Sequence, residues 1–210
     1  MEIPRSERCP APRGLLAVAG VSAVIAALCI VVIDQPLARL VARYEPLAFW
    51  DPAIDAIEYA LLLWIHRLAL PIVLVLGMIV TVSVRRLRIH APAWKFIAGT
   101  HLATRLTTGW FKDGTARLRP GDWLKHASDE TFGWEGGVAF PSGHVTLFAS
   151  VLIPLAVLVP RTRPLFAIIG FVMVARVAVN AHFVSDTVAA ITLVALWTWI
   201  VGSLVRPIRP

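Results

Sequence analysis

The sequence predicts an all-α polytopic membrane protein, a bundle of six transmembrane helices that forms a single domain over residues 1–210. Apolar residues make up 58% of the chain and charged residues only 16%, whereas charged residues form about 25% of a typical soluble domain. The mean hydropathy is +0.74. A soluble fold with this composition would expose too much hydrocarbon to water, and six long apolar runs indicate where the chain enters a bilayer instead.

Short polar or charged segments separate the six apolar runs. A signal peptide is the alternative interpretation of the first run, but no small-x-small cleavage pattern follows it. The second run could begin as early as Ile54, because residues 60–65 are also apolar, although His66 and Arg67 interrupt them. The third is unusually polar and begins with Pro92, which suits the first turn of a helix. The runs cover residues 14–33, 68–84, 92–111, 145–159, 164–179 and 187–205.

The segment between the first two runs, residues 34–67, has its own helical pattern. Its apolar residues are spaced as one face of a helix, which is typical of a short helix lying in the membrane interface. An ordinary surface loop is the alternative. The residues of this face are Leu37, Leu40, Val41, Tyr44 and Leu47.

The charges predict the orientation in the membrane. If the N-terminus is cytoplasmic, the inner segments carry only two acidic residues, Glu2 and Glu7, and the outer segments carry the other 11 of 13. This agrees with the excess of basic residues found in cytoplasmic loops, so both termini are predicted to be cytoplasmic and the net charge of +7 needs no nucleic-acid partner. The Ala-, Val- and Arg-rich composition and compact plan favour a bacterial inner membrane. The inner basic residues are Arg5, Arg8, Arg13, Arg85, Arg86, Arg88, Arg161, Arg163, Arg206 and Arg209.

Three clusters of polar residues fall on the predicted outer side, at or beside helix ends. Grouping at one membrane face, rather than through the depth of the bilayer, is typical of a reaction site and argues against a transport path. The clusters are Lys112-x6-Arg119-Pro120, Pro141-Ser142-Gly143-His144 and Arg176-x5-His182-x3-Asp186.

The cations of these clusters suit a phosphate group. Lys112, Arg119 and Arg176 supply three positive charges, and each arginine can grip two oxygens at once. Ser142 and Gly143 come just before an apolar run, where the free N–H groups of a helix N-terminus also favour an anion. The alternative for Lys112 and Arg119, taken singly, is snorkelling at the membrane interface.

The histidines provide candidate reacting groups. His182 and Asp186 are four residues apart, so on a helix they would face the same way, and the carboxylate could orient one ring nitrogen while the other acts as a nucleophile. His144 would then be available as a general acid for the leaving oxygen.

Between about residues 110 and 190 the sequence resembles the type 2 phosphatidic acid phosphatase superfamily, which includes lipid phosphate phosphatases, glucose-6-phosphatase and vanadium haloperoxidases. The resemblance implies that His182 attacks phosphorus to form a phosphohistidine, that Asp186 orients it, and that His144 protonates the departing alcohol. It implies no metal and no cofactor. In one departure, Ala175 stands where the family often has serine, which we expect to tune activity rather than abolish it. The resemblance assigns phosphate binding to Lys112, Arg119, Ser142, Gly143 and Arg176.

The third run carries a polar stripe that leads towards these clusters. His101, Arg105, Thr108 and Lys112 recur at helical spacing. They could simply pack against polar groups of neighbouring helices. The alternative hypothesis is that Arg105 contacts a second anionic group of the substrate, such as a diphosphate or an acidic headgroup.

The sequence therefore predicts a membrane phosphatase that acts on a phosphomonoester or diphosphate of a lipid, of the undecaprenyl diphosphate, phosphatidate, phosphatidylglycerophosphate or lipid A type. Its expected partners are the lipid substrate and the bilayer, with no protein partner implied. A lipid-to-lipid phosphotransferase would use the same site, and a small transporter is a weaker alternative. A serine protease at Ser142 lacks the Gly-x-Ser-x-Gly arrangement. A haloperoxidase is disfavoured because those relatives are mainly soluble.

Overall fold

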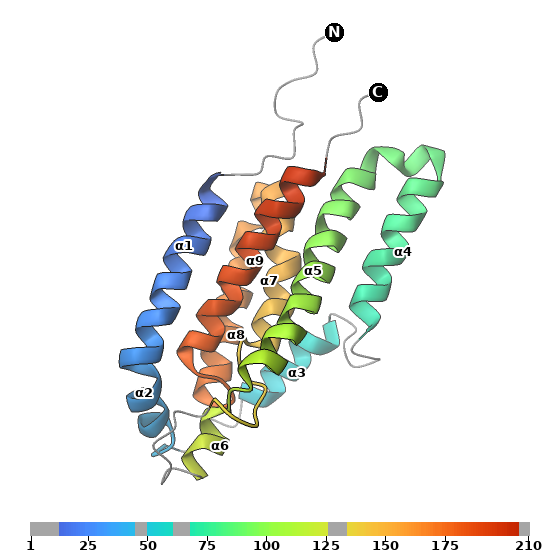
Figure 1. Cartoon of the computed structure of the whole chain (residues 1–210). Coiled ribbons are helices and arrows are strands. Elements are labelled where there is room, and N and C mark those ends of the chain that lie inside the picture. Colours follow the sequence, from blue (N-terminus) through green and yellow to red (C-terminus); the bar gives the residue numbers. More distant parts are fainter. Residues whose placement is uncertain (1–12, 45–49, 61–67, 126–133, 206–210) are drawn as a thin grey trace.

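The computed structural model describes residues 13–44, 50–60, 68–125 and 134–205. Over these ranges the chain is all-helical and contains no strand, as the sequence predicts. Figure 1 shows long helices packed side by side, with the short helices α2 (Asp34–Val41), α3 (Trp50–Ala60) and α6 (Pro120–Lys125) gathered at one end of the bundle. The first residues of α1 and the last residues of α9 lie together at the opposite end.

The N-terminal helix contains one π-helical turn, which lies directly before Asp34. α1 (Arg13–Leu28) passes through a π-helical turn, η2 (Cys29–Ile33), into α2. From α1 into the first residue of η2, the buried positions, such as Ala26 and Cys29, follow each other at intervals of three or four residues. The next deeply buried residue, Asp34, comes five residues after Cys29, which is the repeat of a π turn. The π turn therefore keeps Asp34 on the inner face of the helix.

The segment predicted as an interfacial helix or a loop is helical in part. α2 ends at Val41, and the side chains of Leu40 and Tyr44 are exposed. Leu47 lies outside the described residues. Further along, Trp50 at the start of α3 packs against Phe171, with ring centroids 5.5 Å apart.

The second and third apolar runs form a hairpin with a sharp bend. α4 (Ala69–Ser83) is followed by the 3₁₀ turn η3 (Arg85–His90) and by α5 (Ala91–Thr115), and the chain bends by 120° between the two helices. α4 begins at Ala69, close to the predicted start at residue 68; residues 61–67, which the earlier start would include, lie outside the described residues. Gly77 lets α4 approach α5, because a Cβ there would lie 2.3 Å from the ring of Trp94.

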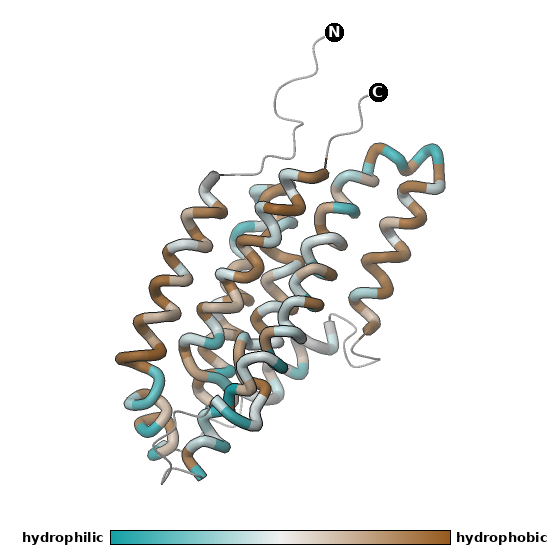
Figure 2. Tube along the Cα trace, in the orientation of Figure 1, coloured by the Kyte–Doolittle hydropathy of each residue, from teal (hydrophilic) through white to brown (hydrophobic). Residues whose placement is uncertain are grey.

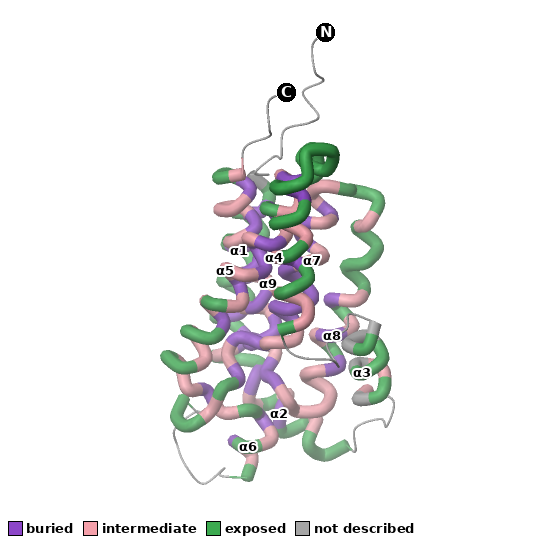
Figure 3. Tube along the Cα trace, turned by 90° about the vertical axis from the view of Figure 1, so that its right-hand side faces the viewer, coloured by how far each residue is buried: buried purple, intermediate pink, exposed green. Residues whose placement is uncertain are grey.

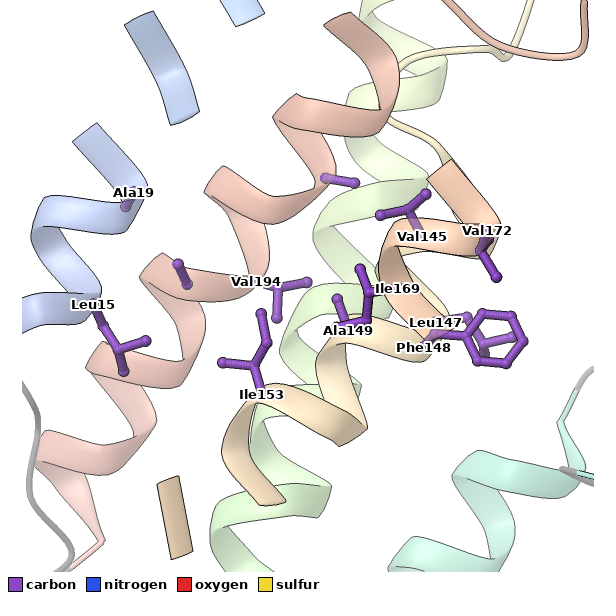
Figure 4. Close-up of a cluster of buried hydrophobic side chains, with 12 residues drawn as sticks. Leu15, Ala19, Val145, Leu147, Phe148, Ala149, Ile153, Ile169, Val172 and Val194 are labelled. Carbon is purple, nitrogen blue, oxygen red and sulfur yellow. The ribbon is translucent and has the colours of Figure 1, made fainter. Parts of the chain in front are cut away.

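The C-terminal half supplies the centre of the bundle. α7 (Gly143–Leu158), the 3₁₀ turn η4 (Pro160–Leu165) and α8 (Phe166–Ala178) lead to α9 (Val184–Leu204), which packs against α1, α5, α7 and α8. Figure 4 shows part of this core, to which α1 contributes Leu15, α7 contributes Ile153 and α9 contributes Val194. Figure 3 shows the buried positions concentrated on these central helices, while α4 carries few buried positions.

Two described helices are long and apolar enough to cross a membrane, the continuous stretch Gly14–Val41 and α9. The bent pair of α4 and α5 makes three if it is counted as one span, and α7 is apolar but shorter, at 16 residues. Figure 2 shows how apolar residues dominate these helices, whereas hydrophilic residues gather at their ends. All six predicted runs thus coincide with helices, but a bundle of six spans remains a prediction.

Candidate active site

A cavity of about 420 Å³ opens at the end of the bundle where α5 ends and α7 and α9 begin. Seven of the predicted site residues line it, and the remaining two, Ser142 and Asp186, are fully buried beside it. Thr108, Gly109 and Leu147 complete the lining. The seven predicted residues in the wall are Arg105, Lys112, Arg119, Gly143, His144, Arg176 and His182.

The first cluster is positioned by the end of α5. Ala116 takes a left-handed conformation (φ 46°) that ends the helix, and its N–H donates to the carbonyl of Lys112. The segment after it is held against the loop that precedes α7, because the N–H of Gly137 donates to the carbonyl of Ala116 at 2.8 Å. A Cβ at Gly137 would lie 2.1 Å from the carbonyl oxygen of Arg117, so this close pairing requires glycine.

Lys112 and the second cluster meet at the start of α7. Lys112 Nζ donates to the carbonyl of Val138 at 2.7 Å. Gly143 lies close to the same amine, because a Cβ added to this glycine would be 3.6 Å from Nζ. Ser142 is the N-cap of α7, which follows a cis Phe140–Pro141 peptide bond. The first N–H groups of a helix have no acceptor within it, so the start of α7 offers donors beside the lysine. This combination is suited to an anion.

The third cluster spans the tight connection between α8 and α9. The N–H groups of Ala181 and His182 both donate to the carbonyl of Arg176, in the last turn of α8. Asp186 lies in the first turn of α9, where its Oδ2 accepts a hydrogen bond from the N–H of Phe183 at 2.8 Å. His182 Nδ1 lies 3.4 Å from the same oxygen.

The predicted approach of His182 and Asp186 is therefore seen, but the helical argument for it was wrong. His182 precedes the N-cap Phe183 and is not part of α9. The two side chains meet because Asp186 folds back over the N-terminus of the helix as a capping residue. A backbone hydrogen bond from Ser142 N–H to the carbonyl of Asp186, 3.0 Å long, ties this turn to the start of α7.

Both histidines of the cavity have lowered pKa values. Burial lowers the pKa of His182, and Arg176 and Lys112 add to this, against the opposing effect of the Asp186 carboxylate. Burial, followed by the charge of Arg176 and the other nearby cations, lowers the pKa of His144 to about 3. Both rings are thus neutral at neutral pH when no anion occupies the cavity.

The polar stripe predicted on α5 divides into two parts. Arg105, Thr108 and Lys112 line the cavity. His101 lies deeper in the bundle, where its Nδ1 is 2.8 Å from Ser150 Oγ, and this part of the stripe packs against a neighbouring helix. Ala175, which replaces the family's frequent serine, is fully buried in α8 and does not line the cavity.

Sequence reasoning missed Arg117, which lies within the first motif. Its side chain is fully buried, and Nη1 donates to Asp186 Oδ1 and to Ser185 Oγ, both at 2.6 Å. Nη2 donates to Asp34 Oδ2 at 2.8 Å. The guanidinium carbon also lies 4.3 Å from the centroid of the Phe183 ring. The available signal was a single acidic residue, Asp34, directly after the first apolar run, which resembled an ordinary helix boundary.

The fold and the site together define a class of protein. It is all-helical, some of its helices could span a membrane, and a cavity rich in cations and histidines lies at one end of the bundle. A family model described as the PAP2 superfamily matches residues 92–209, more than half of the chain. The chain therefore belongs to the type 2 phosphatidic acid phosphatase superfamily, as its sequence motifs predict. Membership of this superfamily supports a phosphatase, a hydrolase that acts on phosphate esters. No curated protein and no solved structure matches the chain significantly.

Proposed function

We propose that the protein is an integral membrane lipid phosphatase that hydrolyses a lipid phosphomonoester or diphosphate through a phosphohistidine intermediate. The observation that supports this best is that His144 and His182 line one cation-rich cavity, with Nδ1 of His182 lying 3.4 Å from the Asp186 carboxylate. Candidate substrates are undecaprenyl diphosphate, phosphatidate, phosphatidylglycerophosphate and lipid A.

In this proposal the phosphate is held mainly by charge. Lys112, Arg119 and Arg176 line the cavity and offer several donors to the phosphoryl oxygens. Ser142 and Gly143 add the start of α7, and the Ser142 Oγ atom is buried with no hydrogen-bond partner in the part of the chain that the structure describes. Preorganised donors of this kind stabilise the negative charge that the phosphoryl oxygens carry in the transition state. Divalent metal is not required in this scheme.

The first chemical step forms a bond between His182 and phosphorus. Because Nδ1 faces the Asp186 carboxylate, the lone pair of Nε2 is the nucleophile. The P–O bond to the lipid breaks, its electron pair stays on the lipid oxygen, and that oxygen takes a proton from His144. Burial and then the nearby cations lower the pKa of His144. A bound phosphate dianion offsets the effect of the cations, and so favours the protonated acid that this step needs.

The second step returns the enzyme to its starting state. His144 removes a proton from water, the resulting hydroxide attacks phosphorus, and the N–P bond breaks with its electron pair returning to His182 Nε2. Inorganic phosphate then leaves. An acceptor lipid in place of water would make the same site a phosphotransferase.

A lipid substrate agrees with the surroundings of the cavity. Arg105 and Gly109 line the wall, and on the same stretch of α5 the side chains of Leu106 and Trp110 are 76% and 71% exposed. Exposed apolar and aromatic groups beside an anion site suit a molecule with a charged head and a hydrocarbon tail. We place this end of the bundle at the outer face of a bacterial inner membrane, with both termini in the cytoplasm.

Phosphate release in detergent from the four candidate lipids tests the proposal. We expect His182→Ala to lower kcat by about 10⁴-fold or more, because the nucleophile is removed. The variant should still insert into the membrane and purify as the wild type does, and EDTA should leave wild-type activity unchanged. Retained activity in His182→Ala would refute the assigned nucleophile. A labelled donor lipid, incubated with and without an acceptor lipid, separates hydrolysis from phosphoryl transfer.

We also propose that Arg105 contacts a second anionic group of the substrate, because it lines the same cavity about two helical turns before Lys112 on α5. Arg105→Ala should reduce kcat/KM for a lipid diphosphate about 10-fold more than for the matching monophosphate, since one charge-assisted contact is lost only with the diphosphate. Arg161→Ala, at an exposed position in η4, is the control. Equal losses on both substrates would contradict this role.

A further inference from the structure

Arg117 is the centre of a buried charge cluster that connects the start of α2 to the start of α9 behind the cavity. The cluster contains two carboxylates, Asp34 and Asp186, and the hydroxyl of Ser185, and none of these four side chains is more than 1% exposed. Arg117 and Asp34 lie 83 positions apart in the sequence, and neither lines the cavity.

Both oxygens of the Asp186 carboxylate accept hydrogen bonds that fix their positions. Oδ1 accepts from Arg117 Nη1 at 2.6 Å, and Oδ2 accepts from the N–H of Phe183 at 2.8 Å. Oδ2 is also the atom that lies 3.4 Å from His182 Nδ1. With Arg117 on one oxygen, the carboxylate cannot rotate away from the histidine without breaking a buried, charge-assisted hydrogen bond.

Arg117 is in turn held by Asp34. Nη2 of Arg117 donates to Asp34 Oδ2, the hydroxyl of Ser185 donates to the same oxygen, and the N–H of Ser185 donates to Asp34 Oδ1 at 3.1 Å. The rings of Phe183 and Trp134 lie against the guanidinium, 4.3 and 4.7 Å from its carbon. The guanidinium therefore has a single orientation, which Asp34 and the two rings determine.

Fold stability alone is a poor explanation for such a cluster. Burying ionic groups has a large desolvation cost, and apolar residues of similar volume often stabilise a fold as well or better. Its placement directly behind the His182–Asp186 pair indicates a role in the reaction.

We propose that Arg117 and Asp34 are positioning residues for the reaction: Asp34 orients Arg117, Arg117 orients Asp186, and Asp186 orients the nucleophilic ring of His182. This inference rests on the proposed function. It also extends the reaction machinery to the N-terminal helix, because Asp34 lies outside residues 92–209, which the family model matches. The π turn before Asp34 is the local feature that brings the carboxylate inward.

The test measures kcat and KM for Arg117→Gln, Arg117→Lys and Asp34→Asn with the best lipid substrate in detergent. We expect kcat to fall about 10- to 100-fold in Arg117→Gln and Asp34→Asn, as is typical when a group that orients a reacting side chain is lost. KM should change less than about threefold, because neither residue lines the cavity. Arg117→Lys should recover part of kcat by keeping the charge.

A double-substitution series separates positioning from mere structural support. If Arg117 acts through Asp186, Arg117→Gln should change kcat less than about threefold when Asp186→Asn is already present. Losses that multiply in the double variant would overturn the inference. The exposed pair of Lys125 and Asp122 provides matched controls, since Lys125→Gln and Asp122→Asn should leave kcat unchanged.

Ser185→Ala keeps the test decisive if Arg117→Gln does not fold, because it removes a hydroxyl of the cluster without leaving a buried charge unpaired. A kcat lowered at nearly constant KM in Ser185→Ala and Asp34→Asn supports the inference; wild-type kcat in both overturns it. If His182→Ala is inactive while the cluster variants are fully active, this inference fails and the proposed function survives. An active His182→Ala would instead contradict the proposed function itself.

Discussion

The wall of the cavity and the buried cluster behind it both use arginine, but they balance its charge in different ways. In the wall, Arg105, Lys112, Arg119 and Arg176 surround one space, and no carboxylate is among the described residues that line it. In the cluster, Arg117 is enclosed by two carboxylates at hydrogen-bonding distance. The wall thus gathers positive charge that a bound phosphate would neutralise, whereas the charge of Arg117 is balanced by carboxylates of the protein itself.

This difference predicts different consequences for substitutions in the two regions. Removing a cation from the wall lessens the attraction for an external anion and relieves repulsion between like charges. Removing the cation of the cluster leaves two buried carboxylates facing each other. We therefore expect the cluster to be the more sensitive region for stability and the wall to be the more sensitive region for substrate affinity.

The largest predicted effect on stability comes from Arg117→Gln. Breaking a buried ion pair by removing one partner costs about 3–5 kcal/mol of unfolding free energy. The exposed ion pair of Lys125 with Asp122, 3.4 Å long, provides the comparison: Lys125→Gln should cost less than about 1 kcal/mol. Denaturant or thermal unfolding in detergent measures both values. Similar losses in the two variants would contradict the distinction between the buried cluster and an ordinary ion pair.

A smaller predicted effect, and one on catalysis, concerns the wall. Arg176→Gln removes a charged donor from the cavity and should lower kcat/KM about 10²- to 10³-fold, the range typical of a lost donor to developing negative charge. Part of this loss should appear as a higher KM, in contrast to the nearly constant KM expected for Asp34→Asn. Arg161→Gln in η4 is the matched control. Indistinguishable kinetics of the two arginine variants would show that Arg176 does not contact the phosphate.

The smallest predicted effect concerns pH. His144 has a pKa of about 3 in the folded protein and an ordinary value of 6.5 when unfolded, so between these values the unfolded state binds more protons and stability falls as the pH falls. From pH 6.5 to pH 5 this amounts to about 2 kcal/mol, since one pKa unit corresponds to about 1.4 kcal/mol.

Melting temperatures at pH 7.5 and pH 5 provide the measurement. The wild type should lose more stability on acidification than His144→Gln does. His90→Gln, which alters an exposed histidine in η3, should behave as the wild type. If His144→Gln is as acid-sensitive as the wild type, the imidazole is not held neutral in the cavity.

Much of the fold could be predicted from hydropathy. All six apolar runs coincide with helices, and the predicted starts of the second and third runs lie within one residue of α4 and α5. Apolar content is a local property of the chain, so it indicates where helices form. It does not show how they cross a membrane. Among the residues that the structure describes, two helices are long and apolar enough to do so, or three with the bent pair of α4 and α5.

Most charged and histidine side chains of the cavity wall could also be predicted, because they lie in short motifs at helix ends. The geometry of His182 and Asp186 could not, since it depends on where α9 begins. Had His182 been inside the helix, the pair would share a helical face; because α9 begins at Val184, the contact arises from capping. A shift of a few residues in a helix boundary is within the uncertainty of any sequence pattern.

By itself the sequence determined the helical character of the chain, the three polar clusters and the excess of cations near them. All of these follow from the order of residues over one or two helical turns. The tertiary structure decided which charges neutralise each other. The Asp34–Arg117–Asp186 cluster requires a π turn in the N-terminal helix, the end of α5 and the start of α9 to meet at one point. Such a meeting depends on how the helices pack, because a buried charge finds its partner by position in space and not by distance along the chain.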